Sequence, residues 1–147
     1  MITSNWFMGA GDLSDAHLIR REVFINEQRV PESIELDDTD GDAVHLVLYD
    51  NGTPAATGRM RVTDEGLVIG RVAVLKAYRG QGFGDLVMRM LIRRAVEAGF
   101  GAQTVHAQIT ARGFYEKLGF EAYGEEFIEA GIAHISMRHD GDVGCTL

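Results

Sequence analysis

A glycine-rich turn between an apolar run and an amphipathic helix is the feature that most constrains how this chain folds. In the segment VAVLKAYRGQGFGDLVMRMLI, residues 72–92, three glycines alternate at positions 80, 82 and 84. Because glycine has no Cβ, successive backbone N–H groups can approach an anion closely, and the start of the following helix adds partial positive charge. The segment therefore predicts a strand–turn–helix unit that can hold an anionic ligand.

The remaining pattern predicts a mixed α+β domain. Asn51-Gly52 lies between two apolar runs and is a strong signal for a hairpin turn. Apolar spacing places Ala16, Ile19 and Val23 on one face of a first helix. We expect strands over 5–10, 43–50, 54–64, 67–75 and 102–109, a strand pair within 120–140, and helices over 12–28, 83–98 and 110–119. The crossover over 67–109 makes part of the sheet parallel.

Composition indicates a single domain without nucleic-acid partners. The 147 residues carry a formal net charge of −8, whereas binding to nucleic acid requires a basic face. The only cysteine, Cys145, cannot form an intrachain disulfide, and no residues have metal-ligand spacing. No apolar run is long enough to span a membrane, and the first residues lack a secretory pattern. We expect one cytoplasmic domain over 1–147 with a flexible tail over 139–147, no metal and no membrane contact.

Two common anion-binding motifs do not fit the glycine turn. A triphosphate-binding loop needs a Gly-Lys pair, which this sequence does not contain. A dinucleotide fingerprint starting at Gly80 would place Asp85 where its third glycine belongs, and this carboxylate would repel a pyrophosphate. A loop that simply joins strand to helix is the plain alternative.

A third motif fits, and a second one supports it. The turn RGQGFG, residues 79–84, matches [QR]-x-x-G-x-[GA], and QITARGFYEKLGF, residues 108–120, resembles N-x-x-A-x-x-F-Y-x-x-x-G-F with Gln108 in the place of Asn. Together they resemble the GNAT N-acetyltransferase superfamily over about residues 12–138, and the stretch EQRVP, residues 27–31, resembles a small bacterial subgroup of it. The resemblance implies a twisted mixed sheet splayed open after its fourth strand, with acetyl-CoA in the opening.

The resemblance also implies which residues contact acetyl-CoA. Backbone groups of the fourth strand would pair with the pantetheine arm, the glycine turn would hold the pyrophosphate, and the second motif would flank the arm. The implied residues are Val72, Ala73, Val74, Arg79, Gly80, Gln81, Gly82, Phe83, Gly84, Gln108 and Phe114.

Acyl transfer from a thioester to an amine also requires proton transfers. By resemblance, Tyr115 is the general acid for the departing thiolate, and the backbone N–H of Val74 polarises the carbonyl. Glu27 follows the first helix, where the family forms its acceptor pocket, and we interpret it as the general base. His45 and His134 are alternative bases.

The other polar residues receive no catalytic role. His17 and His139 are interpreted as surface residues and His106 as a strand residue. The acidic run of Glu32, Glu35, Asp37, Asp38, Asp40 and Asp42 is interpreted as a solvated loop, with a lip that attracts a cationic amine as the alternative. A cysteine in the tail, without partners, is not expected to act as a nucleophile.

The function expected from these motifs is direct acetyl transfer from acetyl-CoA to a primary amine. A non-catalytic acyl-CoA-binding module and a nucleotide-binding domain are the competing interpretations. The acceptor stays open among small amines, amino acids, antibiotics and protein amines. A homodimer is an expectation from the family alone.

Overall fold

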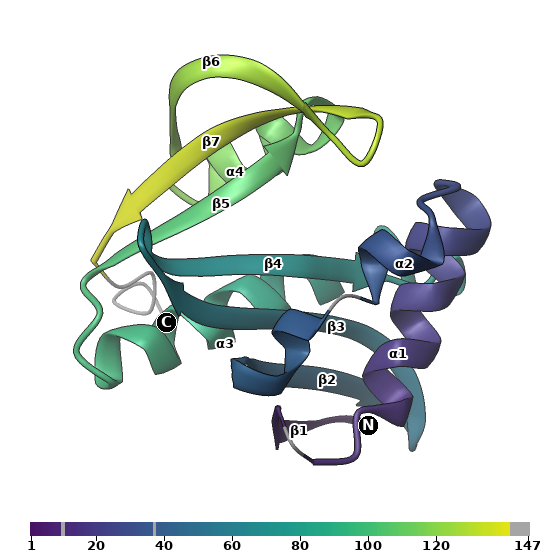
Figure 1. The fold of residues 1–147 in the computed structure, drawn as a ribbon. Coiled ribbons are helices and arrows are strands. Elements are labelled where there is room, and N and C mark those ends of the chain that lie inside the picture. Colours follow the sequence, from purple (N-terminus) through teal and green to yellow (C-terminus); the bar gives the residue numbers. More distant parts are fainter. Residues whose placement is uncertain (10, 37, 142–147) are drawn as a thin grey trace.

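The computed structural model describes residues 1–9, 11–36 and 38–141 and contains a seven-stranded mixed sheet (Figure 1). The strand order is β1-β2-β3-β4-β5-β7-β6. The strands are β1 Ile2–Met8, β2 Val44–Asp50, β3 Thr53–Thr63, β4 Gly66–Val74, β5 Ala102–Gln108, β6 Glu121–Glu129 and β7 Ile132–Asp140. The helices are α1 Ser14–Arg20, η1 Arg21–Glu27, α2 Glu32–Glu35, η2 Asp38–Asp42, η3 Lys76–Tyr78, α3 Phe83–Glu97, η4 Ile109–Ala111 and α4 Arg112–Lys117. This arrangement confirms the expected α+β class.

Helices cover the two faces of the sheet (Figure 1). On one face α3 buries Val87, Leu91 and Ala95, as its apolar stripe predicts, although Ala98 is exposed beyond the end of the helix. On the other face α1 and η1 bury Ala16, Ile19 and Val23 in a second, smaller cluster. The first helix therefore has the predicted buried face, but its second half, η1, is a π-helix. Burial of these stripes fixes both helices against the strands.

The sheet opens between β4 and β5. These strands are parallel, as the crossover predicts, but their pairing is limited to Val68 with Thr104 and Ile69 with Val105. Beyond Ile69 the strands diverge, so β4 and β5 separate toward the side of the molecule where α1 and α2 lie (Figure 1). Within the described residues, the free edge of β4 from Gly70 to Val74 faces this opening without a strand partner. The sequence motif predicts a splay at this place.

A β-bulge shapes the same part of β4. The register between β3 and β4 shifts between Thr57 and Arg59, which pair with Ala73 and Gly70. Arg71 lies at the shift with a φ of 52°, a left-handed conformation that is uncommon for residues other than glycine. Such a bulge bends a strand and increases its local twist, which turns the end of β4 away from β5.

The acidic run contradicts the expectation of a solvated loop. Glu35 and Asp40 are buried, at 1% and 8% exposure. Arg20 Nε donates to Glu35 Oε1 at 2.7 Å and Arg20 Nη1 donates to Asp40 Oδ1 at 2.8 Å. Arg59 Nη1 donates to the same Asp40 oxygen at 2.7 Å. Carboxylates can be buried when guanidinium groups compensate their charge, so these two residues connect α2 and η2 to α1 and β3.

Two further expectations are corrected at the C-terminal side. β7 extends to Asp140, so residues 139 and 140 belong to the sheet and the expected tail was placed too early. His139 is buried rather than on the surface, at 8% exposure, and its Nδ1 lies 2.7 Å from Oε1 of Gln103. Cys145 and the rest of the expected tail from 142 onward lie outside the described residues.

Candidate functional site

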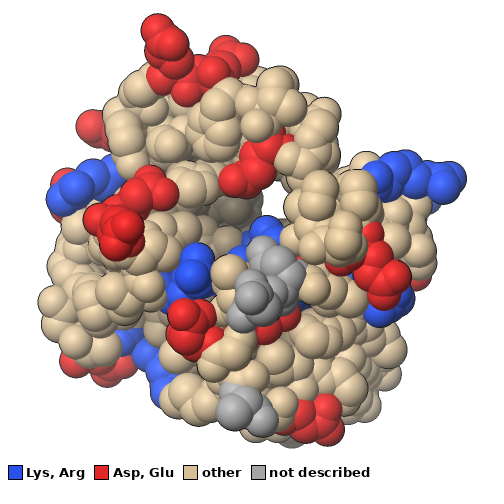
Figure 2. Space-filling model, in the orientation of Figure 1, with Lys and Arg blue, Asp and Glu red and all other residues tan. Residues whose placement is uncertain are grey.

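A single cavity of about 820 Å³ connects the splayed edge of β4 to the β6–β7 hairpin. Eight of the residues predicted for the site line it: Glu27, Val72, Val74, Arg79, Gly84, Gln108, Phe114 and Tyr115. Figure 2 shows a hollow at the centre of this face, with acidic side chains on its upper rim and basic side chains below it. The opening in the sheet and the polar hollow are therefore parts of one space.

The glycine turn forms a cradle of free backbone. Gly80 and Gly82 have φ values of 76° and 85°, and an added Cβ at either would meet no atom within 4 Å. These left-handed conformations favour glycine. Gly82 also precedes α3, whose N-terminus receives no side-chain capping hydrogen bond. The N–H groups of the first turn of α3 are thus left for an anionic ligand.

Neighbouring residues compensate the one carboxylate beside the turn and pack against the turn on one side. Asp85, in the first turn of α3, is bound by Arg89 Nε at 2.8 Å, so its charge is compensated within the helix. Phe114 packs over Gly84, where an added Cβ would lie 3.4 Å from the ring. Phe83 is buried at 5% exposure and packs edge-on against Tyr78, so only its backbone can face a ligand. The turn therefore has the space and the donors that a pyrophosphate needs.

The three strand residues predicted for the pantetheine arm differ in where their side chains point. Val72 and Val74 line the cavity, whereas Ala73 is buried in the cluster below α1. This alternation is the normal period of a strand. A ligand in the opening would contact the two valine side chains and the free backbone edge of β4.

Arg79 is joined to the predicted base, Glu27. Its Nη1 and Nη2 donate to the two carboxylate oxygens of Glu27 at 2.9 and 2.7 Å, and its Nε donates to the Val74 carbonyl at 3.0 Å. The hydrogen bonds from Arg79 lower the pKa of Glu27. A carboxylate with a lowered pKa is a weaker base. The structure therefore joins Glu27 to the glycine turn through Arg79.

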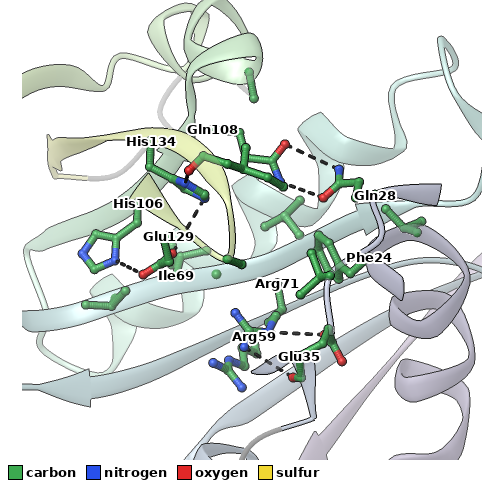
Figure 3. A pocket seen from close by; sticks show the side chains of 18 of the residues that line it. Phe24, Gln28, Glu35, Arg59, Ile69, Arg71, His106, Gln108, Glu129 and His134 are labelled. Atoms are coloured by element: carbon green, nitrogen blue, oxygen red, sulfur yellow. Dashed lines mark hydrogen bonds and ion pairs between the residues drawn. The ribbon is translucent and has the colours of Figure 1, made fainter. Parts of the chain in front are cut away.

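Gln108 forms a second contact across the opening, and sequence reasoning missed its partner. Its side-chain amide donates to Oε1 of Gln28 at 2.8 Å, and the Gln28 amide lies 3.5 Å from Oε1 of Gln108. Glu27 and Gln28 are consecutive at the end of η1, so one segment contacts both the turn before α3 and the end of β5. Figure 3 shows the Gln28–Gln108 pair across the cavity.

Tyr115 lies at the base of the cavity on α4. Its ring packs edge-on against Phe114 and Phe120. Burial raises the pKa of Tyr115 to about 12, so the hydroxyl keeps its proton at neutral pH. This is the protonation state that a general acid requires.

Two histidines and two glutamates form a group on the far wall of the cavity. His106 Nε2 lies 3.2 Å from the Glu65 carboxylate, and its Nδ1 lies 3.8 Å from Glu129 Oε1. His134 Nε2 lies 3.7 Å from Glu129 Oε2. All four residues line the cavity, although they come from the β3–β4 turn, β5, β6 and β7. His45, the other alternative base, is buried outside the lining and its Nε2 contacts the Asp40 carbonyl at 3.2 Å.

Two features are absent from the described part of the chain. No group of three or more His, Cys, Asp or Glu side chains there is arranged to hold a metal ion. No helix within these residues is both long and apolar enough to cross a membrane.

Comparison with known proteins agrees with this geometry. The family model described as "Acetyltransferase (GNAT) domain" matches residues 10–140. Among curated proteins, the uncharacterised N-acetyltransferase YjcF of Bacillus subtilis is 38% identical over 129 residues, which cover 87% of this chain and 92% of YjcF.

Solved structures are similar over nearly the whole chain. An acyl-CoA N-acyltransferase from Pseudomonas aeruginosa superposes with a TM-score of 0.84 at 32% identity, covering 94% of this chain and 99% of that one. Escherichia coli ElaA gives a TM-score of 0.84 at 27% identity, covering 95% and 100%. The chain belongs to the GNAT acetyltransferase family and is an acyl-CoA-dependent N-acyltransferase.

Proposed function

We propose that this protein transfers the acetyl group of acetyl-CoA to a primary amine, by direct attack of the amine while both substrates are bound. The supporting observation is the continuity of the cavity. One space of about 820 Å³ is lined by the free edge of β4, by Arg79 and Gly84 of the glycine turn, by Tyr115 and by the polar wall on β5–β7. Both substrates can therefore meet without a covalent enzyme intermediate, and no nucleophilic side chain is needed.

The cofactor-binding part of this proposal rests on backbone groups. The first-turn N–H groups of α3 and the left-handed glycines would hold the pyrophosphate, and the edge of β4 from Val72 to Val74 would pair with the pantetheine amides. Bound acetyl-CoA would supply an activated thioester. The Val74 N–H would donate to the thioester carbonyl, where negative charge develops during attack. Arg79, Gln108 and Phe114 would flank the ligand.

Tyr115 would complete the reaction as general acid. Its hydroxyl, protonated at neutral pH because burial raises its pKa to about 12, would donate a proton to the departing thiolate sulfur. The nucleophile must be a neutral amine, so a base must also take a proton from the acceptor ammonium. The sequence predicts Glu27 for this step, with His134 as the alternative base that also lines the cavity.

The proposal is tested by measuring CoA release from acetyl-CoA with a panel of amines. The panel should include small alkyl amines, amino acids, aminoglycosides and lysine-containing peptides, and acetylated product should be identified by mass spectrometry. Amine-dependent CoA release with acetylated product supports the proposal. Tight binding of CoA without release for any amine would favour a non-catalytic binding module.

A further inference from the structure

The histidine–glutamate wall of the cavity, formed by Glu65, His106, Glu129 and His134, supports an inference that rests on the proposed function and adds to it. We propose that Glu129 binds the ammonium group of the acceptor and that His134 Nε2 takes its proton. The acceptor class that follows is an amine whose other groups are neutral or cationic, rather than one that carries a carboxylate.

The position of the wall fits this role. β5 and β7 are antiparallel, and Gln108 pairs directly with His134. Since Gln108 is the residue predicted to flank the pantetheine arm, His134 lies next to the place where the thioester would be. Figure 3 shows Glu129 between His106 and His134, all facing the cavity. Glu27, by contrast, is held by Arg79 at the pyrophosphate end.

The hydrogen bonds of His134 select its reactive nitrogen. Its Nδ1 lies 2.7 Å from the Ile132 carbonyl, and because a carbonyl oxygen only accepts, Nδ1 must donate. In the neutral ring the lone pair is then on Nε2, on the side of Glu129. The ring stacks on Phe127 with 5.7 Å between centroids and is only 6% exposed. The orientation of the base is therefore fixed before the acceptor binds.

Glu129 has capacity left for a cation. Its carboxylate lies 3.8 Å from His106 Nδ1 and 3.7 Å from His134 Nε2, which is longer than a hydrogen bond. An ammonium group placed beside it could donate to Glu129 and present a proton to His134. The wall also contains Glu65, which contacts the far nitrogen of His106, so its net charge favours a cation.

The arginines in the cavity do not provide an equivalent site for a carboxylate. Arg59 binds Asp40 at 2.7 Å, and Arg71 Nη2 donates to the carbonyls of Ile34 and Glu35 at 3.2 and 3.3 Å. Arg61 lies 3.6 Å from Asp42. The guanidinium groups of Arg59 and Arg71 are engaged with the acidic run, whereas the Arg61–Asp42 ion pair is longer than a hydrogen bond. Figure 3 shows Glu35, Arg59 and Arg71 apart from the histidine wall.

The proton balance of the reaction assigns one step to each residue. His134 takes one proton from the ammonium before the nitrogen–carbon bond forms. As that bond forms and the carbon–sulfur bond breaks, Tyr115 gives its proton to the sulfur. The nitrogen loses a second proton, which restores Tyr115, and His134 releases the first to solvent. The sum is one amide, one thiol and one proton per turnover.

Three matched acceptors test the preference: 1,4-diaminobutane, butylamine and 4-aminobutanoate. We expect kcat/KM to fall in that order by at least tenfold overall in the wild-type protein, and Glu129→Gln to reduce this span to less than threefold. The control is Glu126→Gln, an exposed residue on β6 outside the cavity lining, which should keep the wild-type values. Preference for 4-aminobutanoate would show that the arginines select the acceptor and would overturn the assignment.

The proton acceptor is tested separately by pH. Glutamine at position 134 can still donate to the Ile132 carbonyl but has no basic nitrogen. With the best of the three acceptors, His134→Gln should lower kcat by at least a hundredfold and remove the rise of kcat/KM with pH that a general base produces. Glu129 is the titratable residue that contacts His134 among those described. If Glu27→Gln rather than His134→Gln removes this rise, Glu27 is the base and the proposal is wrong.

Binding without catalysis separates this inference from the proposed function. In the absence of acetyl-CoA, 1,4-diaminobutane should shift the imidazole NMR signals of His106 and His134 in the wild type but not in Glu129→Gln. Each variant should bind acetyl-CoA as the wild type does. If the wild-type protein does not bind acetyl-CoA, the proposed function is contradicted. Absence of both the NMR shift and turnover with the diamine, in a protein that binds acetyl-CoA, would overturn this inference alone.

Discussion

Tyr115 is the residue on which the proposed chemistry depends most directly. Removing its hydroxyl in Tyr115→Phe should lower kcat by roughly 10²–10⁴-fold, the usual contribution of a general acid. Phenylalanine keeps the ring contacts with Phe114 and Phe120, so the fold and acetyl-CoA affinity should persist. The loss should appear in kcat, measured with an acceptor for which chemistry limits turnover.

Two results would contradict this role for Tyr115. Wild-type turnover in a variant that binds CoA would mean that solvent protonates the thiolate. Failure to bind CoA would mean that Tyr115 is structural. Because burial raises the pKa of Tyr115 to about 12, a fall in kcat/KM on the alkaline side below pH 10 would have to come from another group.

Asp40 allows a prediction about stability at the same scale. Burial alone would raise its pKa, but hydrogen bonds and charge from Arg20, followed by Arg59, outweigh burial and hold the pKa well below its usual range. A lowered carboxyl pKa stabilises the folded state above the pKa of the unfolded chain, about 3.9, and this contribution is lost as the pH falls below it. Asp40→Asn should cost about 3–5 kcal/mol at pH 7, because it removes the buried negative charge that Arg20 and Arg59 share.

Urea unfolding between pH 7 and pH 2 measures this effect. The difference in free energy of unfolding between wild type and Asp40→Asn should narrow as the pH decreases from 5 to 2. Asp42→Asn is the matched control. The Asp42 side chain is 70% exposed, and its contact with Arg61, at 3.6 Å, is longer than a hydrogen bond. An equal loss in both variants would show that the buried network does not stabilise the fold.

At the scale of elements, the turn before α3 can be tested without removing the helix. Gly82 has a φ of 85°, which a β-branched residue rarely adopts. Gly82→Val should therefore distort the cradle and weaken acetyl-CoA binding at least tenfold in calorimetry, while circular dichroism stays unchanged. Gly101→Val is the control, since Gly101 has open space and no positive φ. If a folded Gly82→Val protein binds acetyl-CoA with unchanged affinity, the glycine turn only connects β4 to α3 and does not hold the cofactor.

Helices and turns were predictable from the sequence where the pattern that specifies them lies within one continuous segment. Asn51 and Gly52 have φ values of 48° and 85°, as the hairpin dipeptide predicts, and the stripe of Val87, Leu91 and Ala95 placed α3. Contacts between distant segments were not predictable. Arg20 stands 20 positions before its partner Asp40 in the sequence, and its only signal was a charge beside the apolar stripe of the first helix. Glu129 and His106 meet only because β5, β7 and β6 are neighbours.

The same division applies to the candidate site. Most residues predicted to contact the cofactor lie between positions 72 and 84, around one turn, so a single stretch of sequence predicts them together. The histidine–glutamate wall combines residues from four elements, and neither its histidines nor its glutamates have a recognisable spacing in the sequence. Glu27 was nominated as base from its position after the first helix, and its guanidinium partner, Arg79, is 52 positions away.

For the whole molecule, the splay makes ligand binding and stability interdependent. In the described part of the chain, strand pairing between the sheet halves β1–β4 and β5–β7 is limited to Val68 and Ile69 of β4 with Thr104 and Val105 of β5. A ligand in the opening would therefore add contacts between the two halves. A ligand that binds only the folded state stabilises it by about 2.7 kcal/mol at 100 times its Kd. Acetyl-CoA should therefore raise Tm by roughly 5–10 °C for a domain of this size, while ATP and NAD, which lack the pantetheine arm, should raise it far less.

The exchange of backbone amide hydrogens should slow most along β4 and β5, next to the opening, when acetyl-CoA is bound. An equal shift from ATP and acetyl-CoA would mean that the arm does not occupy the space between the strands, and no shift at millimolar acetyl-CoA would remove the basis for placing it there.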